Sequence, residues 1–193
     1  MTELHRVGIK FFVEEPVMLE LPEVIPVFHR WIQTAAVDGV LIDVADYSHV
    51  PNGPGILLIG HEANYSMDAT GARLGLAYYR KRPGEPTLAE RLRAAARSAL
   101  GACRALETTP ELEGRVHFRD DEVLLFANDR LLAPNDDETY EALRPHFGRF
   151  LDTLFAGENF TISREPDRQE RFSVTARAAA NDGVAGLLGR LAA

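Results

Sequence analysis

Hydrophobic and polar residues alternate near the start of the chain, and this period of two predicts a strand with one buried face. The apolar positions of this strand are Val7, Ile9, Phe11 and Val13. After Pro26 the apolar spacing changes to the three-and-four period of a helix, which we expect to end at Gly39. The apolar face of that helix holds Phe28, Trp31, Ile32 and Ala35. Short apolar runs at 40–44 and 56–59 then predict two buried strands joined by a loop.

Helices and pairs of strands alternate in the rest of the chain. Thr87 and Glu90 stand at the spacing of a capping box and begin the most regular helix, whose apolar stripe runs to Leu106. Two strands are expected to meet at Asp120-Asp121. The predicted elements of this half are, in order, a strand at 74–80, a helix from 87, strands at 116–119 and 122–127, a helix from 136, and a hairpin at 160–176.

This order of elements predicts the α+β class. Short hairpins favour antiparallel pairing, and helices with a single apolar stripe cover one face of a sheet, so we expect a mainly antiparallel sheet with helices packed on one face. The segment from Leu74 to Ile162 has the order β-α-β-β-α-β, which is ferredoxin-like. We expect a single α+β domain over 1–177, followed by a C-terminal tail at 178–193 that forms a short helix or stays flexible.

Composition narrows the class of partner. The chain has 193 residues, of which 46% are hydrophobic and 26% charged, an ordinary balance for one globular domain. A net charge of -8 argues against nucleic acid or an anionic membrane as partner, because both require a basic surface. Cys103 is the only cysteine, which excludes an intrachain disulfide. No apolar run approaches the length of a membrane span, and no secretion signal is evident, so we expect a cytoplasmic protein.

Ionisable and glycine residues are dense between Asp43 and Asp68, on either side of the predicted loop. The candidate ligand-binding residues are Asp46, Tyr47, His49, Gly53, Gly55, His61, Glu62 and Tyr65. If a hairpin brings His49 near His61, these two and Glu62 have the ligand chemistry of a divalent-metal site, or that of an acid–base pair acting on a bound substrate. The two glycines would let a ligand approach the backbone closely.

The same residues have ordinary structural interpretations. Glycine and proline most often form turns, tyrosines anchor half-buried positions, and His61-Glu62 lacks the second histidine of the helical zincin motif, since Tyr65 stands at that position. No Walker loop, dinucleotide fingerprint, nucleophile elbow or paired-cysteine motif is present. The sequence therefore assigns no catalytic residue and no cofactor, and whether the protein is an enzyme stays open.

The segment 41–65, LIDVADYSHVPNGPGILLIGHEANY, resembles the signature stretch of a bacterial family of uncharacterised proteins. The resemblance implies a bacterial source and a domain of unknown function. It brings no activity and no catalytic residue with it.

Two functional hypotheses follow. The first is a small-molecule-binding or metal-binding protein, with enzymatic activity left open, whose site lies at the Gly/Pro/His loop. The alternative is a non-catalytic interaction module that forms a homodimer through a sheet edge or through the leucine-rich tail. The residues that motivate the tail are Val184, Leu187, Leu188 and Leu191.

Overall fold

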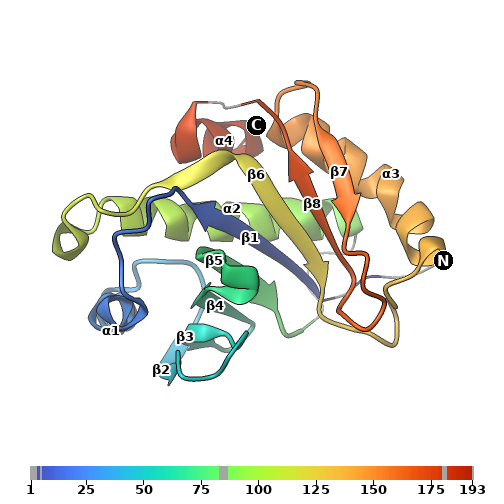
Figure 1. Ribbon diagram of the computed structural model, residues 1–193. Helices are drawn as coiled ribbons and strands as arrows, with labels where there is room; N and C mark the ends of the chain where they lie inside the picture. Colours follow the sequence, from blue (N-terminus) through green and yellow to red (C-terminus); the bar gives the residue numbers. More distant parts are fainter. Residues whose placement is uncertain (1–3, 5, 83–86, 180–181, 193) are drawn as a thin grey trace.

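The computed structural model describes residue 4 and residues 6–82, 87–179 and 182–192. Within these ranges the chain is an α+β protein with one eight-stranded antiparallel sheet and four α-helices (Figure 1). The strands are β1 (Val7–Val13), β2 (Leu41–Tyr47), β3 (Gly55–Gly60), β4 (Ala63–Asp68), β5 (Gly75–Arg80), β6 (Phe118–Ala127), β7 (Thr161–Arg164) and β8 (Ser173–Arg177). The helices are α1 (Val24–Thr34), α2 (Leu88–Glu107), α3 (Asp137–Leu154) and α4 (Gly183–Ala192).

The strand order is β2-β3-β4-β5-β1-β6-β8-β7, and every neighbouring pair is antiparallel. Strands β2 to β5 form a meander in which each strand pairs with the next along the chain. The first strand then lies in the middle of the sheet, between β5 and β6. Segments far apart in the sequence therefore meet on the central strands.

The helices pack on one face of the sheet, as the single apolar stripes predict. On β1 the side chains of Ile9, Phe11 and Val13 belong to this covered face and are buried in the hydrophobic core. Helix α2 packs against β1 and β5 and runs behind the central strands in Figure 1, while α4 packs against β6 and α1 against β2 and β3. No helix within the described ranges is long and apolar enough to cross a membrane.

The ferredoxin-like order of the second half is not confirmed. The two strands predicted at 116–119 and 122–127 are a single strand, β6, so this half reads β-α-β-α-β. Strand β6 runs through Asp120-Asp121 without a turn, and its pairing with β1 shifts register at this point, between Phe11 and Val13 of β1. Strand β4, which has polar residues at alternate positions, is not among the strands predicted from the sequence.

In the described part of the tail, residues 183–192 form the helix α4. The apolar residues Val184, Leu187 and Leu191 are at most 3% exposed, and the helix packs against α2 and β6. This apolar stripe is therefore used inside the chain. Of the two surfaces expected for a homodimer, the sheet edge is the one that stays open, since β2 has no partner beyond β3 among the described strands and Ile42 is exposed there.

Candidate functional site on the open face of the sheet

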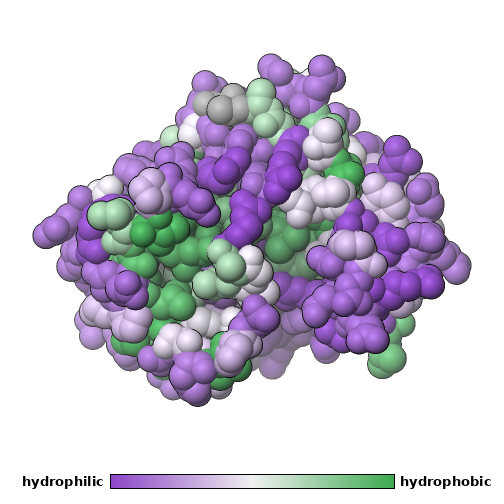
Figure 2. Space-filling view, viewed as in Figure 1, coloured by the Kyte–Doolittle hydropathy of each residue, from purple (hydrophilic) through white to green (hydrophobic). Residues whose placement is uncertain are grey.

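The face of the sheet opposite the helices is rich in polar side chains that are nevertheless buried. Register places on this open face every second residue of each strand, such as Gly8, Lys10 and Phe12 on β1. Six polar residues on it are less than 9% exposed: Lys10, Asn64, Ser66, Asp68, Glu122 and Ser173. Figure 2 shows a band of hydrophilic residues crossing this side of the molecule, with hydrophobic residues on either side. Since burying a charge is costly unless it is paired, these side chains need partners within the sheet.

Lys10 is held by three acceptors. Its ammonium donates to the Asp68 carboxylate at 2.6 Å, to the Arg73 carbonyl at 2.8 Å and to the Asp68 carbonyl at 3.2 Å. The stem of Lys10 reaches these groups by crossing Gly75 of β5, where a Cβ would stand 2.7 Å from the lysine Cε. Burial lowers the pKa of Lys10, and this outweighs the opposite effect of Asp68. The contact ties β1 to the connection between β4 and β5.

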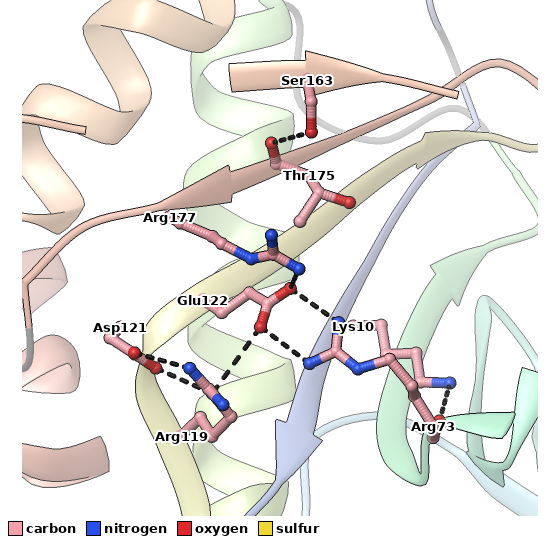
Figure 3. Close-up of polar contacts among 8 residues, drawn as sticks. All are labelled: Lys10, Arg73, Arg119, Asp121, Glu122, Ser163, Thr175 and Arg177. Carbon is pink, nitrogen blue, oxygen red and sulfur yellow. Dashed lines mark hydrogen bonds and ion pairs between the residues drawn. The ribbon is translucent and has the colours of Figure 1, made fainter. Parts of the chain in front are cut away.

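Glu122 is the centre of an arginine cluster (Figure 3). Arg73 donates to both carboxylate oxygens at 2.7 Å, Arg177 lies 3.0 Å away and Arg119 lies 3.6 Å away. Burial alone would raise the pKa of Glu122, but the hydrogen bonds from Arg73 and Arg177 outweigh it, and the pKa is lowered. Arg119 is also bound through two nitrogens to Asp121, at 2.9 and 2.7 Å. The carboxylate therefore stays ionised although the side chain is only 1% exposed.

Arg73 links this cluster to an apolar surface. Its guanidinium lies 3.8 Å from the centre of the Phe12 ring, and the Lys10 ammonium lies 5.4 Å from the same ring. Such stacking is typical of arginine, because its flat guanidinium carries charge on an apolar plane. The Phe12 ring is thereby covered by cations on the open face, without a helix.

A pocket of 480 Å³ opens beside Arg73. Its apolar walls are Phe12, Val13, Val17, Leu19, Leu21, Pro22, Ala69, Ala72 and Leu74. Its polar lining consists of Glu15, Glu20, Ser48 and Arg73. The walls come from three places in the chain: the segment after β1, the connection between β4 and β5, and the first residue of the Gly/Pro/His loop. A pocket of this volume with mostly apolar walls and a few polar groups is typical of small-molecule sites.

Five of the residues predicted for the site lie at the β2–β3 end of the meander. Asp46 accepts hydrogen bonds from the Ser48 backbone, at 2.8 Å, and hydroxyl, at 2.6 Å, which lower the pKa of Asp46 and position Ser48 at the pocket. Tyr47 ends β2 and is 41% exposed, and His49 lies in the exposed turn. The two glycines serve the backbone of the chain itself. They are Gly53, whose N–H closes the turn on Val50, and Gly55, where a side chain would collide with the Met67 carbonyl.

The other three predicted residues lie at the opposite end of β3. His61 and Glu62 form the turn into β4, with His61 Nδ1 2.8 Å from the Glu62 carboxylate. Tyr65 is 1% exposed and donates its hydroxyl to the Asp38 carbonyl at 3.0 Å; burial strongly raises the pKa of Tyr65. His61 and Glu62 line a separate pocket of 350 Å³ with Arg80 and others.

The metal site expected from His49, His61 and Glu62 is not assembled. Strand β3 separates the two histidines, and its length is roughly 20 Å at about 3.3 Å per residue. In the part of the chain that the structure describes, no group of three or more His, Cys, Asp or Glu side chains is arranged to hold a metal ion. The predicted residues therefore divide between two ends of the hairpin, and the first end borders the 480 Å³ pocket.

The central polar residues of the open face were missed by the sequence analysis. Lys10, Asp68 and Arg73 each stand on or beside a strand as one polar residue among apolar neighbours, and Glu122 ends the charged run 119–122; both are also patterns of a solvated strand face. Lys10 and Asp68 are 58 residues apart, and Arg73 and Glu122 are 49 apart. Only the strand order brings them together.

The fold and site define an α+β protein whose eight-stranded sheet is covered by helices on one face and carries a buried charge network on the other, with a pocket beside Arg73. No family model, no curated protein and no solved structure matches this chain. The function is therefore inferred from the geometry of the open face and of the pocket beside it.

Proposed function

We propose that the protein binds a small organic molecule in the pocket beside Arg73, with the apolar body of the ligand against Leu19, Leu21 and Leu74. The observation that carries the proposal is a pocket of 480 Å³ with apolar walls that adjoins a fixed network of buried charges. Small-molecule sites occupy about 300–1,000 Å³ and combine apolar walls with a few placed polar groups.

The charge network supports binding by fixing the walls of the pocket. Lys10 holds the Asp68 and Arg73 carbonyls, and the Arg73 side chain is held in turn by Glu122. These contacts hold the β4–β5 connection in one conformation before a ligand arrives. A preformed site loses less conformational entropy on binding, which raises affinity.

The fluorescent probe 1-anilinonaphthalene-8-sulfonate tests this proposal, because it binds apolar pockets of this size. Val17 lines the pocket and is 39% exposed, so Val17→Trp fills the pocket without disturbing the core. Val50, which is 40% exposed and outside the pocket lining, gives the matched control Val50→Trp. We expect saturable binding of one probe molecule to the wild type, a loss of affinity of about tenfold or more in Val17→Trp, and no change in Val50→Trp.

Near-ultraviolet circular dichroism of each variant controls for loss of packing, since partly unfolded states also bind this probe. Equal effects of the two tryptophans in folded proteins, or a fluorescence increase that does not saturate, would contradict the proposal.

A further inference from the structure

A second feature of the open face lies on β5, β1 and β6, beyond the contacts of Lys10 with Asp68 and Arg73. Register places Gly8 opposite Tyr79 on one side and opposite Phe126 on the other. A Cβ at Gly8 would collide with the Phe126 ring, so the glycine lets that ring lie flat on the sheet. The guanidinium of Arg171 then stacks on the ring, 3.8 Å from its centre.

Arg171 differs from the other arginines of this face, because no carboxylate among the described residues forms an ion pair with it. Arg73, Arg119 and Arg177 all bind Glu122 or Asp121. Among the described residues, no hydrogen bond and no ion pair involves the Arg171 guanidinium, which stacks on the aromatic ring. Burial lowers the pKa of Arg171 although Asp68 and Tyr79 favour the charged form. Asp68 itself is occupied by Lys10.

A hydroxyl proton is available next to this guanidinium. Asn64 donates to the Tyr79 oxygen at 3.3 Å, so the Tyr79 hydroxyl accepts one hydrogen bond and keeps its own proton for an acceptor. Burial raises the pKa of Tyr79, which keeps the phenol protonated. The Tyr79 and Phe126 rings are 6.4 Å apart, so the phenol and the guanidinium flank the same ring.

We propose that Arg171 and Tyr79 form an anion-binding site over Phe126 that takes the carboxylate or phosphate group of a small molecule. A guanidinium binds either group through two parallel hydrogen bonds, and the desolvated setting strengthens them. An oxyanion there would form the ion pair that neither Asp68 nor Glu170 forms with the guanidinium. This site is distinct from the pocket beside Arg73, because Gly8 and Phe12 are four residues apart on β1, about 13 Å at 3.3 Å per residue.

Titration with inorganic phosphate and, separately, with acetate tests the site, at constant ionic strength and followed by the backbone amide resonances of Gly8 and Ser173. We expect both residues to shift with a saturable dependence on at least one of the two anions. The anion with the lower dissociation constant identifies which of the two groups the ligand carries. Shifts that rise linearly and spread over the whole chain for both anions would overturn the proposal.

Substitutions make the test specific. Arg171→Gln should abolish saturable binding. Arg171→Lys should weaken binding about tenfold, because a lysine cannot form the bidentate hydrogen bonds of a guanidinium. Tyr79→Phe, which removes one hydrogen-bond donor, should weaken binding about fivefold. Arg168→Gln, in the same β7–β8 loop and exposed, removes an equal charge and should leave the dissociation constant unchanged. Equal losses in Arg168→Gln and Arg171→Gln would show general electrostatic attraction and refute the site.

Thermal unfolding separates a binding role from a structural one. Arg171→Met removes the half-buried charge and keeps an apolar stem on Phe126, so without anion we expect an unfolding temperature equal to or above that of the wild type. Added phosphate or acetate should then raise the unfolding temperature of the wild type and not that of Arg171→Met. A lower unfolding temperature in Arg171→Met, with equal responses to anion, would make Arg171 a structural residue.

Discussion

The two faces of the sheet are buried by different means. On β1, Phe11 points to the covered face and is 0% exposed, while its neighbour Phe12 points to the open face and is 5% exposed. Helices cover Phe11, whereas Arg73 and Lys10 lie across Phe12. On the open face, long cationic side chains thus take the place of a second helix layer, with their stems on apolar groups and the charges of Lys10 and Arg73 paired with carboxylates.

The two faces of the sheet contribute differently to the protein. The covered face mainly stabilises the fold, and the open face mainly fixes the positions of side chains. Burial of apolar surface stabilises a fold by about 25 cal/mol per Å², whereas a buried ion pair is close to neutral against an apolar pair of the same volume. The covered face therefore carries most of the free energy of folding. The charge network of the open face instead holds particular groups in particular positions, which is what a binding surface requires.

The largest expected loss of stability is found by comparing alanine variants of the two phenylalanines. Phe11→Ala leaves a cavity under the helices and should reduce the free energy of unfolding by about 4 kcal/mol. Phe12→Ala should cost about 2 kcal/mol, since water and the Arg73 stem can enter the space it leaves. Urea denaturation of both variants measures the difference. Equal losses would mean that both faces are packed as a closed core.

The next effect concerns the Lys10–Asp68 pair. Asp68→Ala leaves a buried ammonium without its carboxylate and should cost about 3 kcal/mol in urea denaturation. The double variant Lys10→Met with Asp68→Asn removes both charges and should lie within about 1 kcal/mol of the wild type. A double variant as unstable as Asp68→Ala would show that the pair stabilises the fold by itself.

The smallest expected effect is the pH-dependent contribution of Glu122 to the free energy of unfolding. The folded-state pKa of Glu122 lies below its ordinary value, so its contribution is fully present above the unfolded pKa near 4.5 and is lost as pH falls through the folded pKa. Glu122→Gln should therefore cost about 2 kcal/mol at pH 7, and the gap to the wild type should narrow below about pH 4.5. Urea denaturation at a series of pH values measures it. A gap that stays constant down to pH 2 would mean that the charge of Glu122 is not what binds the arginines.

The covered face could be predicted from the sequence, and the open face could not. Alternation such as Ile9, Phe11, Val13 marks an apolar face regardless of which strands are neighbours, so the α+β class and the single helix layer follow from local pattern. The polar face is different, because the partner of Lys10 depends on the order β4-β5-β1, and nothing local specifies it.

The expected convergence of His49 and His61 failed for a related reason. Strand β4 is not among the strands predicted from the sequence, so the sequence does not identify His61-Glu62 as the turn into a second hairpin. With β4 in place, the two histidines stand at opposite ends of β3. The interpretation of Gly53 and Gly55 as turn and backbone residues, which the sequence left open, agrees with their contacts.

The central position of β1 has a consequence for biosynthesis. This strand is made before both of its neighbours, β5 at Gly75–Arg80 and β6 at Phe118–Ala127. The local hairpins from β2 to β5 can form as they leave the ribosome, because they require only short loop closures. The amino-terminal strand, apolar along one side, must instead wait for Ala127 before both its edges are paired, and during that interval it is the segment on which a chaperone would act.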